Sequence, residues 1–306
     1  MRQLNKSHIN LIAVLIIAIS ATFLTYNYES VETESQTISK EDDSKLNNHP
    51  VITDPVITDA KRIIALAPHI VESLFEIGAG DRIVGAVEYS DFPNAALDIP
   101  RIGGYYGLQI EKILELNPDL IIVWKSGNKS ADIERLEKLN IPIAYSEPNS
   151  IDGVANELRS FGDMTNSHKL AEQQAKKFEQ KLKSIREQYS QASDISLFYQ
   201  LWSEPMMTVN KNTWIHQLIE TCGATNVFAE NSTDYPQISI ENVILKSPEI
   251  IVMPEEKSNK PQPKIDWKKW DVIPAVQDEQ FLTVDADLIH RFSSRMLLGL
   301  EDMCKK

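Results

Sequence analysis

The stretch "YYGLQIEKILELNPDLIIVW", residues 105–124, returns later in the chain as "YPQISIENVILKSPEIIVM", residues 235–253. Three landmarks of the first copy recur 130 positions further on, Tyr105 as Tyr235, Glu111 as Glu241 and Pro118 as Pro248. In both copies an aromatic residue comes first, followed by Ile-Glu, a short helical pattern, a Pro-acid pair and a β-branched run. Three aligned landmarks and a shared strand pattern predict an internal repeat.

Each copy lies within a longer alternation of strand and helix patterns. Residues 61–163 contain four such strands, at 62–68, 82–87, 119–124 and 141–146, which predicts a parallel α/β lobe. The alternation resumes in residues 193–306 and predicts a second lobe. Residues 167–191, between them, contain neither Gly nor Pro and carry an apolar stripe, so we expect one long helix within a connecting segment, 164–192. The fold class is therefore α/β, with two Rossmann-like lobes, a single connecting helix and a ligand cleft between the lobes.

The first 60 residues have a different character. A basic start is followed by an apolar run at 11–24, which is typical of an export signal. Ile9 and Tyr26 extend this run towards the length of a membrane anchor, so residues 1–28 are either a cleaved signal peptide or an anchor. Residues 29–60 are acidic and poor in large apolar side chains, which predicts a flexible linker.

Composition excludes several classes of function. The formal net charge of −13 argues against a nucleic-acid partner, which would require a basic face. No nucleophile elbow, phosphate-binding Gly-rich loop or zinc-protease motif is present, so the sequence predicts no enzyme activity. Cys222 and Cys304 are the only cysteines, too few for a zinc site. In an exported protein they most simply form a disulfide that fixes the last helix to the second lobe, the alternative being two buried thiols.

Several aromatic residues follow predicted strands or precede the repeated helices. Parallel α/β lobes bind ligands at the carboxyl ends of their strands, so these positions are candidates for the lining of a cleft. The candidates are Phe92, Tyr105, Tyr106, Trp124, Trp202 and Tyr235. Any one of them could instead be a core residue. As a group beside Gly, Pro and Ser, they favour a large, flat, partly apolar ligand such as a tetrapyrrole-like ring.

These positions also carry a family resemblance. The segments "YSDFP", "GLQIEKILELNPDLIIVWKSGN", "YPQIS", "ETCGATNVF" and "HRFSSR" resemble the cobalamin-binding branch of the ABC-importer substrate-binding proteins whose lobes are joined by a backbone helix. The resemblance runs from about Arg62 to the C-terminus. It implies the class III periplasmic binding protein fold, cobalamin as transported ligand and no resident cofactor. It also implies a periplasmic monomer, free or tethered by its first segment, that delivers its ligand to a permease dimer with ATPase subunits.

The resemblance assigns roles to individual residues. It implies ligand walls made of Phe92, Tyr105, Trp124, Tyr235 and either Leu201 or Trp202. It also implies that Asp287 contacts the amide groups of the corrin ring. We expect His69 and His290 to be polar contacts at the rim of the cleft rather than metal ligands.

Some positions depart from the family pattern. Tyr105 and Tyr235 stand where the resemblance leads us to expect Trp, and Leu288 and Ile289 replace aromatic residues. Heme-binding relatives use a tyrosine near residues 105–106 as an iron ligand. Heme bound by Tyr105 or Tyr106 is therefore an alternative ligand, a siderophore a weaker one, and a corrinoid- or porphyrin-modifying enzyme the least favoured reading.

The repeat itself has a function in this family, because each lobe presents a glutamate to an arginine pocket of one permease subunit. Glu111 and Glu241 match those positions. A two-fold transporter needs two equivalent contacts, and charge pairs set register and speed encounter. Stabilisation of each helix N-terminus by its glutamate is the alternative explanation, but it does not account for the long repeated context.

Overall fold

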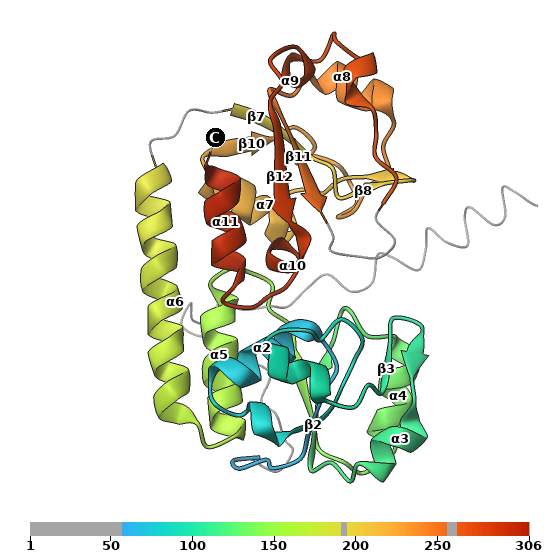
Figure 1. Ribbon diagram of the computed structural model, residues 1–306, viewed down its shortest axis with the longest axis vertical. Helices are drawn as coiled ribbons and strands as arrows, with labels where there is room; N and C mark the ends of the chain where they lie inside the picture. The colour runs from blue at the N-terminus through green and yellow to red at the C-terminus, as the bar shows by residue number, and fades with distance from the viewer. Residues whose placement is uncertain (1–56, 191–194, 256–261, 306) are drawn as a thin grey trace, which may run out of the picture. The chain divides into compact units, whose positions relative to one another are not determined.

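The first of the two lobes is built on a parallel four-stranded sheet of order β2-β1-β5-β6 (Figure 1). The computed structural model describes residues 57–190, 195–255 and 262–305. The strands are β1 (Ile63–Ala65), β2 (Ile83–Ala86), β5 (Leu120–Trp124) and β6 (Ile143–Ser146). The helices of this lobe are α2 (Pro68–Glu76), α3 (Ile110–Glu115), α4 (Ser130–Glu137) and α5 (Gly153–Met164). The two central strands are buried and apolar, as expected for a parallel sheet.

The second lobe is built on another parallel four-stranded sheet, of order β10-β7-β11-β12. Its strands are β7 (Ile195–Tyr199), β10 (Ala224–Asn226), β11 (Ile250–Glu255) and β12 (Phe281–Asp285). Its helices are α7 (Trp214–Thr221), α8 (Ile240–Lys246), α9 (Pro274–Gln277), α10 (Ala286–Ile289) and α11 (Met296–Cys304). Three 3₁₀ turns are also described: η1 (Gly80–Arg82) and η2 (Asn94–Asp98) in the first lobe, and η3 (Trp267–Lys269) in the second.

The two sheets are equivalent, and this equivalence explains the internal repeat. In each lobe the first strand, β1 or β7, lies at an inner position, with the second strand on one side and the third on the other. The repeated segment supplies the helix before the third strand and that strand itself, namely α3 and β5 in the first lobe and α8 and β11 in the second. The predicted repeat and the predicted α/β fold are both confirmed.

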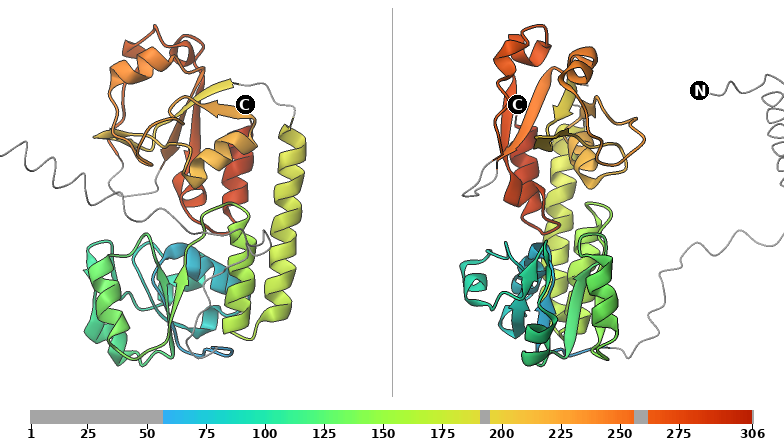
Figure 2. Two further views of the ribbon diagram at one scale, coloured as in Figure 1. Left: turned by 180° about the vertical axis from the view of Figure 1, so that it is seen from behind. Right: turned by 90° about the vertical axis from the view of Figure 1, so that its right-hand side faces the viewer.

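The long helix predicted between the repeats is α6 (His168–Tyr189). It runs alongside α5 in both views of Figure 2. Its apolar stripe is buried, with Phe178, Leu182 and Ile185 in a hydrophobic core that also contains residues of both lobes. Gly162 of α5 permits the close approach of the two helices, because a Cβ there would lie 2.4 Å from that of Ala171. The linking helix is thus part of the core.

Local structure differs from expectation at two turns. The pattern "GLQIEKILELN", residues 107–117, predicts a helix from Gly107 onward, but Gly107 and Leu108 form strand β4 (Gly107–Leu108), paired with β3 (Gly103–Gly104). The pattern "ISLFYQLW", residues 195–202, predicts one strand, but β7 ends at Tyr199, and β8 (Trp202–Ser203) pairs with β9 (Met206–Met207). Both hairpins hold aromatic residues at or beside their turns, so these departures position candidate ligand walls.

The predicted disulfide between Cys222 and Cys304 is confirmed. It joins the C-terminal end of α7 to the last residue of α11. Among the described helices, none is long and apolar enough to cross a membrane. Residues 1–28, predicted as signal or anchor, and residues 29–56 of the predicted linker lie outside the described part of the chain.

Candidate functional site

A cavity of about 400 Å³ lies between the two lobes. The first lobe lines it with Pro68, His69, Tyr89, Asp91 and Trp124, and the second with Trp202, Ala286, Asp287, His290 and Arg291. A second cavity of about 190 Å³ shares Pro68, Tyr89 and Trp124 with the first and extends to Tyr105, Lys129 and Asp132. Because three residues line both cavities, we treat them as one interlobe cleft, at the carboxyl ends of β1 and β5.

Trp124 is the central aromatic wall of this cleft. It is the last residue of β5, and its backbone N–H donates to the Asn128 side chain at 2.8 Å. Its ring meets that of His69 edge-on, with centroids 5.4 Å apart. A Cβ on Gly127 would lie 2.0 Å from the indole, so the ring lies directly against the backbone of this glycine. The indole is therefore held in one orientation by its surroundings.

The more exposed aromatic residues of the cleft are Tyr105, Tyr89 and Trp202. Tyr105 lies at the turn of the β3–β4 hairpin, where Gly103 and Gly107 take positive φ angles of 130° and 141°. Its side chain is 80% exposed, and the Lys129 ammonium lies 5.8 Å from its ring centroid. Tyr89 is itself in the left-handed region, with φ 63°. Three exposed aromatic faces at the mouth of a cleft provide stacking surfaces for a flat ligand.

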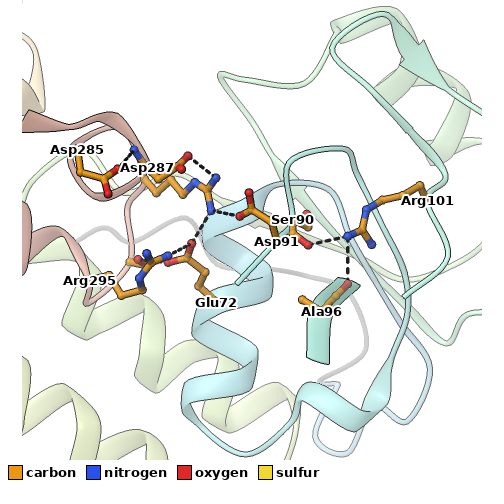
Figure 3. Close-up of polar contacts among 10 residues, drawn as sticks. Glu72, Ser90, Asp91, Ala96, Arg101, Asp285, Asp287 and Arg295 are labelled. Carbon is orange, nitrogen blue, oxygen red and sulfur yellow. Dashed lines mark hydrogen bonds and ion pairs between the residues drawn. The ribbon is translucent and has the colours of Figure 1, made fainter. Parts of the chain in front are cut away.

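Polar groups at the cleft are organised around Arg291, whose partners Glu72, Asp91 and Asp287 are labelled in Figure 3. Its guanidinium donates to Asp287 at 2.6 Å, to Asp91 at 2.7 Å and to Glu72 at 2.8 Å. Burial alone would lower the pKa of Arg291, but hydrogen bonds to Asp91 and Glu72 outweigh it and the pKa is raised. Asp287 is the second residue of α10, and its backbone N–H donates to the side chain of Asp285, which caps this helix. The arginine thus remains charged and holds two carboxylates at the cleft, one from each lobe.

Arg101 supports the loop that carries Asp91. Its guanidinium donates to the carbonyl oxygens of Ile99, Ser90 and Ala96, and the last two of these contacts are drawn in Figure 3. A charged group with several backbone acceptors fixes a loop more firmly than a neutral donor does. The loop position of Asp91 is therefore set from within the first lobe.

Two histidines line the cleft, of which His69 is buried and His290 is half-buried. His69 Nε2 lies 2.7 Å from the Ser146 hydroxyl, and burial lowers the pKa of His69 to about 3. His290 Nε2 lies 3.0 Å from the Tyr199 hydroxyl, and burial lowers the pKa of His290 to about 4. Both rings are neutral at physiological pH. Among the described residues, no group of three or more His, Cys, Asp or Glu side chains is arranged to hold a metal ion.

The structure brings four of the predicted site residues to the cleft: Tyr105, Trp124, Trp202 and Asp287. Phe92 lies elsewhere, on a separate cavity of about 760 Å³ beside α6, where the Arg295 guanidinium is 3.7 Å from its ring centroid. Tyr106 and Tyr235 are exposed and line neither cavity of the cleft. Leu201 is half-buried and packs against the main core.

The two predicted docking residues have matching positions. Glu111 and Glu241 are each the second residue of their helix, α3 or α8, and both are exposed. Figure 1 shows α3 and α8 at the outer ends of the two lobes, on the side away from α6. A hydrogen bond from Ser239 lowers the pKa of Glu241. Neither residue lines the cleft.

Sequence reasoning missed three residues of the cleft: Tyr89, Asp91 and Arg291. Tyr89 and Asp91 lie in the same short segment as Phe92, just after β2, so the rule that selected Trp124 also applied to them. Arg291 lies in the segment "HRFSSR" that carries the family resemblance, but nothing near it indicates its contacts with Asp91 and Glu72, which are 200 and 219 positions away in sequence.

Comparisons with known proteins agree with this architecture. The sequence profile of the family described as "Periplasmic binding protein" matches residues 63–288. A vitamin B12-binding protein of Vibrio campbellii is 33% identical over 246 residues, covering 80% of this chain and 89% of the relative. The crystal structure of the periplasmic vitamin B12 binding protein BtuF of Vibrio cholerae matches with a TM-score of 0.74 and 34% identity, covering 81% of this chain and 96% of that one.

A more distant structure shares the fold alone. The periplasmic heme-binding protein RhuT of Roseiflexus sp. RS-1 matches with a TM-score of 0.68 and 19% identity, covering 81% of this chain and 97% of that one. The fold is thus shared by receptors that are named for different ligands. Since the family profile covers both lobes, this chain belongs to the periplasmic binding protein family.

Proposed function

We propose that this protein is the substrate-binding component of an ABC importer and that it captures cobalamin in the cleft between its lobes. The observation that carries the proposal is the cleft itself, lined by the aromatic residues Trp124, Tyr89 and Tyr105 and by the carboxylate of Asp287. Aromatic faces suit the flat corrin ring, and a carboxylate held by Arg291 accepts hydrogen bonds from its amide groups. Proteins at 33–35% identity carry the name vitamin B12-binding protein.

Calorimetry with cyanocobalamin and with hemin tests this proposal. We expect cyanocobalamin to bind the wild-type protein and Trp124→Ala to weaken that binding at least tenfold, which corresponds to about 1.4 kcal/mol. Trp270→Ala is the matched control, because Trp270 is a half-buried tryptophan that packs on Trp267 away from the cleft. Absence of cyanocobalamin binding by the wild-type protein would refute the proposal.

Heme is the second candidate, favoured by the tyrosine pair at the β3–β4 turn. The Tyr105 side chain lines the smaller cavity of the cleft, and its ring centroid lies 5.9 Å from that of Tyr106. An iron-bound tyrosinate would shift the Soret band of added hemin. If Tyr105→Phe or Tyr106→Phe abolished this shift, and the wild-type protein did not bind cyanocobalamin, heme would be favoured over cobalamin.

The same proposal includes the partners and the location. We infer that the protein is an exported monomer, free in the periplasm or tethered by residues 1–28, and that its task is capture and delivery with no chemical step. Glu111 and Glu241 are the proposed contacts to the two permease subunits of a transporter with ATPase subunits. Their exposure and matching helix positions support this role. The proposed division of the chain is 61–163 and 193–306 for the lobes, with 164–192 between them.

A further inference from the structure

We propose that Glu72 is a positioning residue that holds the two sides of the ligand cleft in register across the lobe junction. Glu72 lies on α2 of the first lobe and is only 4% exposed. It lines neither cavity of the cleft, so its effect on a ligand would pass through other residues. The inference rests on the proposed function only for the identity of the ligand used as a probe.

Every described hydrogen bond to the Glu72 carboxylate comes from the second lobe. Oε1 accepts from Arg291 Nη1 at 2.8 Å and from Arg295 Nη1 at 2.9 Å, and Oε2 accepts from the Ser293 hydroxyl at 2.5 Å. The three donors lie in the short segment between α10 and α11, 219 to 223 positions from Glu72 in sequence. Glu72 is the fifth of the nine residues of α2, and Figure 3 shows its carboxylate facing Arg295 of this segment. Glu72 is therefore an anchor between the lobes rather than a part of one lobe's internal structure.

The anchor is connected to the cleft through a single guanidinium. Arg291 Nη1 is shared between Glu72 and Asp91, and Nη2 bonds Asp287. Asp91 follows the exposed wall Tyr89 by two residues, and Asp287 is the proposed contact for ligand amides. The side chain of Arg291 is 8% exposed, so it has little water to replace a lost partner. The position of Arg291, and with it the spacing of Asp91 and Asp287, depends on Glu72.

Electrostatics makes this dependence strong. Glu72 is the only carboxylate in a described ion pair with Arg295 and one of three with Arg291, so removing its charge leaves Arg295 uncompensated at the junction. Without the Glu72 charge, Arg291 and Arg295 repel each other across the site that the carboxylate occupied. The junction then relaxes by separating the lobes or by moving Arg291, and either change disturbs a cleft whose walls come from both lobes.

The decisive variant is Glu72→Gln, which keeps the side-chain shape and removes the charge. We expect its cyanocobalamin affinity to fall at least tenfold, with most of the change in the dissociation rate, because the cleft walls are no longer held in register. Glu72→Asp keeps the charge at shorter reach and should restore part of the affinity. Glu134→Gln is the control, because it removes one carboxylate charge from the same lobe at an exposed position of α4, away from the junction, and should bind as the wild type does.

A second measurement reports on the junction without any ligand. Spin labels on cysteines introduced at the exposed positions Lys138 and Lys246, one in each lobe, give the distribution of interlobe distances in the full chain. Glu72→Gln should broaden or lengthen this distribution, whereas Glu134→Gln should leave it unchanged. If Glu72→Gln does not fold, Arg295→Met tests the same junction, since it removes one of the two arginines and keeps an apolar contact for Phe92.

The two proposals fail in different ways. If the wild-type protein binds no cyanocobalamin, the proposed function fails, and the distance measurement alone decides the role of Glu72. An unchanged distance distribution together with unchanged affinity in Glu72→Gln would overturn the inference. A loss of thermal stability with neither a wider distribution nor weaker binding would assign Glu72 a purely structural role and would also overturn it.

Discussion

Glu157 of α5 carries a carboxyl group near Ser146, the residue that contacts His69 of the cleft. Its Oε2 is buried with no hydrogen-bond partner, and burial raises its pKa from 4.5 to about 7. The Ser146 hydroxyl, which also bonds His69, acts against that shift, and the charge of Glu147 adds to it. Since the folded protein keeps this proton up to about pH 7 and the unfolded chain loses it near pH 4.5, the free energy of unfolding should fall as the pH rises between these values.

Glu157→Gln should remove this pH dependence. We expect the variant to be more stable than the wild type at pH 8 by roughly 3 kcal/mol and about equal to it at pH 4. Urea denaturation at pH 4, 6 and 8 measures the difference, in which contributions from His69 and His290 cancel. Glu134→Gln, at an exposed position of α4, is the control and should show no such trend. A stability difference independent of pH would contradict the interpretation.

Gly127 offers a second test at the scale of one residue. A Cβ at this position would lie 2.0 Å from the Trp124 indole, so Gly127→Ala must move the ring. We expect ligand affinity to fall severalfold and the tryptophan fluorescence to change, while the lobe remains folded. Gly153→Ala is the control, because the nearest atom to its Cβ, Ser150 Oγ, is 3.4 Å away and the residue begins α5. Equal affinities for the two variants would show that the Trp124 orientation does not matter for binding.

At the scale of elements, the disulfide fixes α11 to α7. The two cysteines are 82 positions apart, and closing so long a loop should stabilise the folded protein by about 2–5 kcal/mol. Urea denaturation of the oxidised and reduced protein measures this difference, with Cys222→Ala/Cys304→Ala as the variant that cannot be reoxidised. The two thiols should be inaccessible to titration in the native, non-reduced protein. Two free thiols under those conditions would exclude the bond.

Elements with a local pattern could be predicted from the sequence, and those fixed by distant contacts could not. The apolar stripe on α6 and the apolar run of β5 can be recognised in the sequence, because each pattern is formed by residues close together in the chain. Gly107 and Leu108 were assigned to a helix because the pattern after them is helical, whereas pairing with residues 103–104 makes them a strand. The junction of Glu72 with Arg291 joins residues 219 positions apart, and nothing near either residue indicates it. Trp124 and Asp287 reach the cleft as expected, whereas Phe92 does not.

At the scale of the whole molecule, the test concerns transport rather than binding. Glu111→Lys and Glu241→Lys should leave cyanocobalamin affinity unchanged, because both residues lie outside the cleft. Each should reduce uptake or transporter-stimulated ATP hydrolysis, since a lysine facing an arginine pocket is repelled. The double variant should be more impaired than either single one. Full transport by the double variant would mean that the repeated glutamates serve only their own helices.

The common strand order of the two lobes has a consequence for orientation. Because each lobe carries an exposed glutamate at the start of an equivalent helix, a partner with two equivalent halves could accept this protein in either of two poses half a turn apart. If both poses led to transport, the number of productive docking poses would double, which corresponds to about 0.4 kcal/mol. The residues beside the glutamates differ between the lobes, so the two poses are not equivalent. Lys112 bonds the Arg101 carbonyl in one lobe, and Asn242 completes a capping box in the other. The orientation of docking would then depend on the residues beside Glu111 and Glu241 and not on the two glutamates themselves.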